Sequence, residues 1–399
     1  EGGIGSGVIP IRGLSDEHTT LAELLKNEGY GTAGVISCNF LAKSYGLHQG
    51  FDYYNDYIPS VASFMNSCAA VSFLNIFLPL DDFLSSTGHN GHKTAQQINA
   101  SATAWLAQQD LKKPFFLMTH YFDAHHPYFP EKMGMKNVPA SIINRYNPCT
   151  NYLDLEKQII DSIISGRKKL LPDEKDFLVG NYDRLIAALD KKLGEFFSQL
   201  KKMGLYDDSL IIIVSDHGES FGEHNLMLHG LSLYEDNLRV PLLIKYPLSG
   251  QVKGTVDYPV SLAGLAPTVL SYASIPVPDF MQGSPLFEPH SQKILAMLYY
   301  SGSTQWSLPE ALQGDQFSLL DQGHKLIQFG NGQKQVFDLT GDPEETNNKM
   351  NEREAISEKL LADLHHHIKK LTDLTTGGDT NQTIDKGAIQ NLKNLGYIK

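Results

Sequence analysis

Residues whose types suit a metal ion follow the most strongly apolar segment of the sequence. Residues 209–214 read Ser-Leu-Ile-Ile-Ile-Val, and such a run indicates a strand buried on both faces, as in the centre of a parallel sheet. Ser215-Asp216-His217-Gly218-Glu219 follows directly. Open α/β sheets bind ligands at the carboxyl ends of their strands, and aspartate beside histidine suits a hard or borderline metal ion. We expect Gly218 to allow a sharp turn, and Glu219 and Glu223 to orient imidazole rings as hydrogen-bond acceptors.

Further histidines and carboxylates lie close behind this segment. Taken alone, Asp216 and His217 could form an ordinary polar turn without a ligand. His224, His229 and Glu235 then add to them, so that four acidic residues and three histidines gather within twenty residues. Polar surface loops rarely concentrate imidazole groups in this way. A metal or anion site is therefore the favoured interpretation.

A second polar segment follows another predicted strand, residues 115–119. It reads His120-Tyr121-Phe122-Asp123-Ala124-His125-His126-Pro127-Tyr128 and is expected to reach the same edge of the sheet. His125 could donate a hydrogen bond to an anionic ester oxygen or protonate a leaving group. For His120 and His126 a structural role is favoured instead.

The pattern of helices and strands predicts how these segments are positioned. Helices and strands alternate across residues 18–275, which predicts a doubly wound, mostly parallel α/β sheet flanked by helices. Residues 130–170 lack clear periodicity until Leu153 and are expected to be an irregular excursion. Short β-like segments near 294–300, 316–320, 324–329 and 335–339, with a helix near 353–370, predict a small sheet and one packed helix. We expect a main α/β domain over residues 1–285 and a small C-terminal subdomain over residues 286–399.

Composition narrows the possible partners. The 399 residues carry a formal net charge of −12, which argues against general affinity for nucleic acid or an anionic membrane. A small anionic substrate is not excluded, because a metal ion can reverse the local potential. The odd, low number of three cysteines excludes a disulfide framework. The sequence has no Cys-x-x-Cys motif, so a zinc site with thiolate ligands is not expected.

One segment, residues 57–80, has no charged residue and is rich in apolar side chains. Several serines, asparagines and a proline interrupt it, whereas a transmembrane helix needs about 20 apolar residues. A buried or lid-like helix is therefore favoured. The alternative is an apolar surface that contacts lipid or an apolar substrate.

Motifs in a characteristic order connect these observations to a known family. The sequence resembles the sulfatase family of the alkaline phosphatase superfamily along nearly its whole length. The matching motifs are Gly29-Tyr30 with Thr32-Ala33, Gly50-Phe51-Asp52, Asp123-x-His125-x-Pro127-Tyr128, Ser215-Asp216-His217-Gly218-Glu219, Gly222-Glu223-His224, Leu233-Tyr234-Glu235 with Arg239-Val240-Pro241-Leu242, Phe337-Asp338-Leu339 with Asp342-Pro343 and Glu345, and Leu395-Gly396-Tyr397-Ile398.

The resemblance implies a divalent metal ion beside a covalent nucleophile. Asp216 and His217 match one pair of metal ligands in the family, and His125 matches a histidine that contacts the ester anion. His229 matches a position near the leaving group, where it could act as an electrostatic clamp or a general acid. Ca²⁺ is the expected ion, with Mg²⁺, Mn²⁺ and Zn²⁺ as alternatives.

Two features of the family are missing from the sequence. The family's second pair of metal ligands is an Asp pair on the first strand, and its nucleophile is a formylglycine made from Cys or Ser in Cys-x-Pro-x-Arg or its Ser version. Neither motif occurs here, and both normally lie upstream of the point where this sequence begins. We therefore expect an N-terminally truncated chain that is inactive as it stands, in a protein that the resemblance places in the periplasm or outside the cell.

Three functions remain open at this stage. Hydrolysis of a sulfate ester on a small molecule, a glycan or a lipid is favoured. Phosphoester or phosphonate hydrolysis, or phosphoethanolamine transfer, is the alternative within the superfamily. A catalytically inactive binding protein is the alternative of another class, and the intact set of His125, Asp216, His217 and His229 argues against it. The sequence does not predict the oligomeric state.

Overall fold

The computed structural model describes residues 13–57, 92–130, 134–146, 149, 151–248, 253–287, 293–299 and 308–375. The chain divides into two compact units, which we call unit 1 and unit 2. Unit 1 comprises Glu1–Pro139, Phe177–Tyr206 and Thr380–Lys399, and unit 2 comprises Ala140–Asp176 and Asp207–Asp379. The boundary near residue 285 stays a prediction. Apart from Tyr57, the uncharged segment 57–80 lies outside the described residues.

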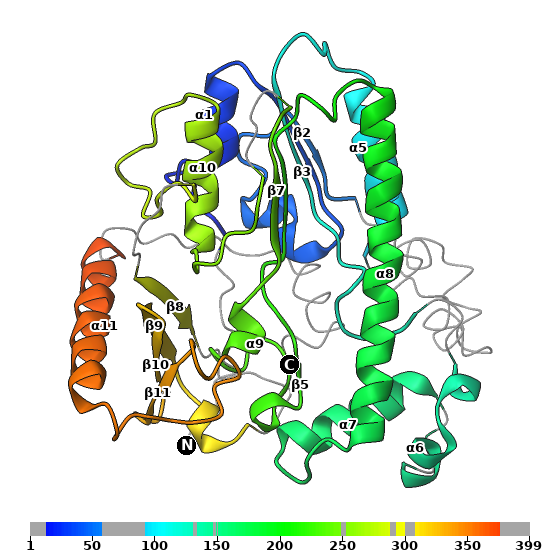
Figure 1. Cartoon of the computed structure of the whole chain (residues 1–399). Helices are drawn as coiled ribbons and strands as arrows, with labels where there is room; N and C mark the ends of the chain where they lie inside the picture. Colours follow the sequence, from blue (N-terminus) through cyan, green and yellow to red (C-terminus); the bar gives the residue numbers. More distant parts are fainter. Residues whose placement is uncertain are drawn as a thin grey trace, which may run out of the picture. The chain divides into compact units, whose positions relative to one another are not determined.

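Unit 1 contains a three-stranded parallel sheet with the order β2-β1-β3 (Figure 1). β1 (Gly31–Val35) is its central strand, between β2 (Tyr53–Asn55) and β3 (Phe115–Thr119). Its register pairs Gly31 with Phe115 and Ala33 with Tyr53. The parallel sheet predicted from the alternation of helices and strands is therefore present, and the polar residues after β1 and β3 leave from the same edge.

Helices of unit 1 pack on this sheet. α1 (Leu21–Asn27) and α5 (Ala95–Leu106) both contact β1. Each begins with a capping box, Thr20 with Glu23 and Thr94 with Gln97, which satisfies backbone N–H groups of the first turn. α8 (Pro172–Lys202) continues through unit 1 from residue 177, and Asn99 of α5 donates to its Lys192 carbonyl at 2.9 Å.

The strand that precedes the 215–219 loop differs from the prediction. β4 (Ile211–Val214) pairs with β7 (Leu242–Lys245) in antiparallel orientation, and within the described residues these two strands form a sheet of their own. Val214 is 38% exposed and Leu243 is 57% exposed. The apolar run correctly predicts a strand, but the prediction of a parallel sheet buried on both faces was wrong here. Pairing direction and coverage depend on neighbouring segments, which the composition of one strand does not specify.

Unit 2 also contains helices that the sequence did not predict. α6 (Ala140–Arg145) and α7 (Tyr152–Ile164) lie within residues 130–170, where an irregular excursion was expected, and α8 begins after them at Pro172. Ile159, Ile160 and Ile163 give α7 a buried apolar face. β5 (Ser220–Phe221) and β6 (Met227–Leu228) form a short hairpin, and α9 (Glu235–Leu238) and α10 (Leu265–Tyr272) follow.

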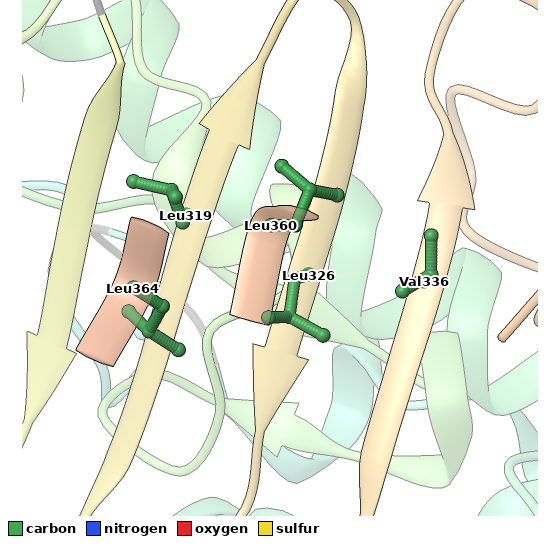
Figure 2. Close-up of a cluster of buried hydrophobic side chains, with 5 residues drawn as sticks. All are labelled: Leu319, Leu326, Val336, Leu360 and Leu364. Carbon is green, nitrogen blue, oxygen red and sulfur yellow. The ribbon is translucent and has the colours of Figure 1, made fainter. Parts of the chain in front are cut away.

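The C-terminal part of unit 2 agrees with the prediction. β8 (Ile294–Leu298), β9 (Gln316–Asp321), β10 (His324–Gln328) and β11 (Lys334–Asp338) form an antiparallel sheet, and α11 (Glu354–Thr375) lies along it (Figure 1). The buried cluster between them is shown in Figure 2 and consists of Leu319, Leu326, Val336, Leu360 and Leu364. Burial of each such side chain contributes about 1.5–3 kcal/mol.

Short 3₁₀ helices complete the described elements. They are η1 (Asn39–Leu41), η2 (Lys43–Tyr45), η3 (Met135–Asn137), η4 (Glu223–Asn225), η5 (Leu262–Gly264) and η6 (Glu310–Leu312). Across the described part of the chain, every helix is too short or too polar to be a membrane span.

The C-terminal cluster generates a prediction about stability. Leu326→Ala removes a fully buried side chain and leaves a cavity, so the free energy of unfolding should fall by about 2–5 kcal/mol. Leu248→Ala is the matched control, because Leu248 is 67% exposed and its truncation should change stability by less than about 0.5 kcal/mol. Urea unfolding of both variants checks the difference, and equal losses would contradict the packing in Figure 2.

Candidate active site

The 215–219 loop leaves the end of β4 and turns sharply under α9. The Ser215 hydroxyl donates to the His217 carbonyl at 2.7 Å, and the His217 backbone N–H donates to Oδ1 of Asp216 at 3.1 Å. A Cβ atom on Gly218 would lie 2.1 Å from the Asp236 carbonyl oxygen. Gly218 is therefore required because the backbone of α9 approaches closely.

Asp216 and His217 present two adjacent donor atoms. Nδ1 of His217 lies 2.8 Å from the Gly218 carbonyl oxygen. Since a carbonyl only accepts hydrogen bonds, Nδ1 carries the proton and Nε2 carries the lone pair that a metal ion requires. Nε2 lies 3.7 Å from Oδ1 of Asp216, close enough for both atoms to bind one ion. The Asp216 side chain is 79% exposed.

These two donors fit part of a ligand set for a divalent ion. One carboxylate oxygen and one imidazole nitrogen suit Ca²⁺, Mg²⁺, Mn²⁺ or Zn²⁺. Across the ranges that the structure describes, no group of three or more His, Cys, Asp or Glu side chains could hold an ion. The assignment of Asp216 and His217 as ligands therefore stays a prediction.

The side chains of Glu219 and His229 are in direct contact. Nδ1 of His229 lies 3.1 Å and 3.2 Å from the two carboxylate oxygens of Glu219. The Glu219 side chain is only 5% exposed, so the imidazole N–H is an important partner for a buried charge. The Nδ1 proton of the imidazole therefore points to the carboxylate. The predicted role of Glu219 as an acceptor for an imidazole is confirmed.

The His229 ring also stacks on His217. Their ring centroids are 3.8 Å apart and the ring planes differ by 23°. The structure therefore brings Asp216, His217, Glu219 and His229 together, although ten residues separate Glu219 from His229 in the sequence. Their common position was predicted from composition alone.

The third histidine of this region has a different environment. His224 stacks on Tyr234 with ring centroids 3.5 Å apart, and burial lowers its pKa against the opposing charges of Asp236 and Glu223. Glu223 accepts from the Phe221 backbone N–H and pairs with Lys175 at 2.6 Å. The prediction that Glu223 orients an imidazole ring by accepting its hydrogen bond was wrong, because the lysine of α8 takes its carboxylate.

A buried ion group supports α9 from the C-terminal sheet. Lys325 of β10 is 1% exposed, and its Nζ lies 2.7 Å from Glu235 and 2.9 Å from Glu345. Glu345 also accepts from the backbone N–H of Glu235 at 2.6 Å. Burial raises the pKa of Glu345, and the Lys325 charge opposes this. The burial of Lys325 could not be predicted from the sequence, because a lysine in a short strand gives no signal of burial.

His125 belongs to unit 1, whereas the other three predicted site residues belong to unit 2. Its ring stacks on Phe122 with a centroid distance of 4.0 Å. Nδ1 lies 2.5 Å from the His126 carbonyl oxygen, so the proton is on Nδ1. Asp123 accepts from the Ala95 backbone N–H at the start of α5. Burial raises the pKa of Asp123.

Polar residues at the edge of the unit 1 sheet are held by short contacts. Ser37 is fully buried, and its hydroxyl lies 2.8 Å from Nδ1 of His120. Nζ of Lys93 donates to the carbonyl oxygens of Ile36 and Asn55 and to the Asn55 side chain. Burial lowers the pKa of Lys93 to about 8. These contacts fix the segments that follow β1 and β2, and they give His120 the structural role predicted for it.

The comparisons with known proteins agree with this fold. Residues 3–275 match the sulfatase family model, and residues 222–373 match the model for the C-terminal part of N-sulphoglucosamine sulphohydrolase. The chain therefore belongs to the sulfatase family.

Similar proteins are named sulfatases. An arylsulfatase of Clostridium perfringens is 28% identical over 66% of this chain and 55% of its own length. Arylsulfatase K of Xenopus laevis is 26% identical over 84% of this chain and 65% of its own length. An N-acetylglucosamine-6-O-sulfatase of Bacteroides thetaiotaomicron is 24% identical over 90% of this chain and 73% of its own length. The chain thus spans less than two thirds of the first two relatives.

Solved structures share the fold. A structure solved in complex with its substrate D-glucosamine-2-N,6-O-disulfate has a TM-score of 0.59 at 20% identity, covering 94% of this chain and 85% of that one. A phosphonate monoester hydrolase from Silicibacter pomeroyi has a TM-score of 0.59 at 20% identity, covering 93% and 84%. The predicted alkaline phosphatase-like α/β class, with a C-terminal antiparallel sheet, is confirmed.

The environment of His224 generates a prediction about pH. A histidine whose folded pKa is below its unfolded value of about 6.5 binds protons more readily in the unfolded chain. Its contribution to stability is therefore complete above that value and decreases as the pH falls through it. His224→Asn removes the titrating group and tolerates the positive φ of 51° at this position.

We expect the His224→Asn variant to lose less stability than the unsubstituted protein between about pH 7.5 and about pH 5. Urea unfolding at both pH values measures the two losses. His366→Asn, on α11, is the matched control and should keep the full loss. The same pH dependence in all three proteins would contradict the burial of His224.

Proposed function

We propose that the protein hydrolyses a sulfate ester and that the 215–219 loop and His229 belong to its reaction centre. The observation that carries the proposal is the arrangement of Asp216, His217, Glu219 and His229 within one unit. Two donors for a metal ion lie beside an imidazole that a buried carboxylate orients. Such an arrangement serves ester cleavage, because the ester oxygen and the leaving oxygen both need stabilisation.

Asp216 and His217 would hold a divalent metal ion in this proposal. A bound ion would polarise the ester and stabilise its negative charge. Ca²⁺ is the proposed ion because the aspartate is a hard ligand, and Mg²⁺, Mn²⁺ and Zn²⁺ remain alternatives. The Nδ1 hydrogen bond of His217 to its neighbouring carbonyl selects the neutral tautomer whose lone pair is on Nε2, the nitrogen nearer to Asp216.

His229 is proposed to act as the general acid. Its Nε2 proton can transfer to the leaving oxygen as the ester bond breaks, and Glu219 orients the ring through Nδ1. Contact of His125 with the ester anion stays a prediction, and its Nδ1 is engaged with a backbone carbonyl. The nucleophile is not assigned to a residue of this sequence, in which none of the three cysteines begins a Cys-x-Pro-x-Arg motif.

A sulfated sugar is the proposed substrate class. The relative from Bacteroides thetaiotaomicron is named for a 6-O-sulfate of N-acetylglucosamine, and a solved structure of the same fold contains a glucosamine disulfate. Contact with a membrane through residues 57–80, and a periplasmic or extracellular location, stay predictions.

Phosphonate or phosphoester hydrolysis is the second candidate. A phosphonate monoester hydrolase shares the fold, and the Glu219–His229 pair serves either leaving group. Rates with 4-nitrophenyl sulfate, 4-nitrophenyl phosphate and a phenylphosphonate ester separate the two activities. A sulfate rate at or below the other two would contradict the proposal. Binding of these esters without turnover would favour an inactive binding protein.

Substitution of His229 tests its role as the acid. His229→Gln removes the proton donor, so kcat should fall by about 10²- to 10⁴-fold with a phenyl or sugar sulfate, whose leaving oxygen needs protonation. The loss should be much smaller with 4-nitrophenyl sulfate, whose leaving group departs as a stable anion. Equal losses with both esters would contradict general-acid catalysis. His224→Asn serves as the control and should affect both esters little.

Substitution of Asp216 tests the metal site without requiring activity. Asp216→Asn should weaken Ca²⁺ or Mn²⁺ binding by more than about tenfold in titration calorimetry, because a charged ligand becomes neutral. Asp208→Asn is the matched control, since Asp208 is an exposed aspartate shortly before β4. Unchanged affinity in both variants would remove Asp216 from the ligand set.

A further inference from the structure

Two separate loops must stay close together for Glu219 and His229 to remain in contact. Glu219 follows Gly218 in the first loop, and His229 precedes Gly230 in the second. The two side chains meet at 3.1 Å, a distance that a small movement of either loop would abolish. The β5–β6 hairpin, in which Ser220 pairs with Leu228, brings the two backbones near each other, and further contacts beyond its open end hold Glu219 and His229 in place.

Asn237 of α9 reaches both loops. Its backbone carbonyl accepts from the Gly218 N–H at 2.7 Å, and its side-chain Oδ1 accepts from the Gly230 N–H at 3.1 Å. The two glycines adjoin Glu219 and His229 respectively. Asn237 is 5% exposed, so these bonds lie where water does not compete with them.

The amide nitrogen of Asn237 also makes a hydrogen bond. Nδ2 donates to the Ser220 hydroxyl at 2.7 Å, and this hydroxyl donates to Asp236 at 2.6 Å. The amide orientation follows from this, because only its oxygen can accept from Gly230. Gly218 directly precedes Glu219 and Ser220 directly follows it. Asn237 therefore binds the residue on each side of Glu219.

The first loop also packs closely against the backbone of α9. The Asp236 carbonyl oxygen occupies the place where a side chain on Gly218 would begin. α9 is held in turn by the hydrogen bond from the Glu235 N–H to Glu345 and by Lys325. The helix that carries Asn237 is therefore itself fixed at its first residue.

We propose that Asn237 is a positioning residue that holds Glu219 and His229 in hydrogen-bond contact. Its catalytic consequence rests on the proposed function of His229 as an acid. The structural consequence, an intact Glu219–His229 hydrogen bond, requires no catalysis and can be measured separately. A residue that only stabilised the fold would lower the free energy of unfolding without acting on this pair.

The test compares three variants of the full chain at one pH and at a temperature below unfolding. Asn237→Ala removes the side-chain bonds to both loops. Asn237→Asp keeps the acceptor for the Gly230 N–H but loses the donor to the Ser220 hydroxyl, whose single proton goes to Asp236. Asn348→Ala is the matched control, because Asn348 accepts from the backbone N–H groups of Val336 and Met350, both outside the two loops.

The readout is the Nδ1–H proton resonance of His229 in ¹⁵N-histidine-labelled protein, assigned by its absence from His229→Gln. We expect the resonance in the unsubstituted protein and in Asn348→Ala, its loss in Asn237→Ala, and its return in Asn237→Asp. Persistence in a folded Asn237→Ala protein, or equal loss in Asn348→Ala, would overturn the proposal. If Asn237→Ala does not fold, Ser220→Ala replaces it and should weaken the same resonance.

Kinetics then separate this inference from the function on which it rests. Asn237→Ala should reduce kcat by about 10- to 100-fold with little change in KM, as for other residues that orient a reacting histidine. These rates are measured on the full-length protein, because the 399 residues alone are expected to be inactive. Absence of sulfatase activity in the unsubstituted full-length protein contradicts the proposed function and leaves the resonance as the test of Asn237. Full activity in Asn237→Ala, with the resonance lost, would contradict the catalytic part of the inference.

Discussion

The hydrogen bond between the Glu219 carboxylate and Nδ1 of His229 is the contact on which the candidate site depends. The carboxylate is almost completely buried, and an unpaired charge in that position would cost several kcal/mol. The bond therefore joins the two loops while it selects the tautomer of the imidazole. Because the same ring stacks on His217, the orientation of the predicted metal ligand follows from it as well.

The contact between Glu219 and His229 also depends on the C-terminal sheet. The loops that carry Glu219 and His229 are hydrogen-bonded to α9. The first residue of α9 in turn contacts Lys325 and Glu345, which are buried charged side chains. A buried ion group is weak evidence for added stability, but removing one partner is strongly unfavourable. The small sheet is thus a structural support of the site, and the order of β9, β10 and β11 positions Lys325 beneath α9.

Local patterns were enough to predict much of the fold and the composition of the site. The apolar runs predicted β3 and β4, and the polar residues after β4 predicted the group around His217. Pairing could not be predicted in the same way, because the antiparallel partner of β4 is a strand thirty residues away. Glu219 and Glu223 have the same chemistry and similar neighbours in the sequence. Only the position of Lys175, on α8, decides which of them remains available for an imidazole.

Three histidines within thirteen residues show how environment divides one type of side chain among different tasks. His217 faces a carbonyl through Nδ1, so its other nitrogen is kept as a neutral donor. His229 faces the buried Glu219 carboxylate through the same atom, and this contact orients its ring beside His217. His224 faces the Tyr234 ring, and its burial favours the neutral form. The partner of Nδ1 thus separates the predicted ligand from the proposed acid, although their rings are in contact.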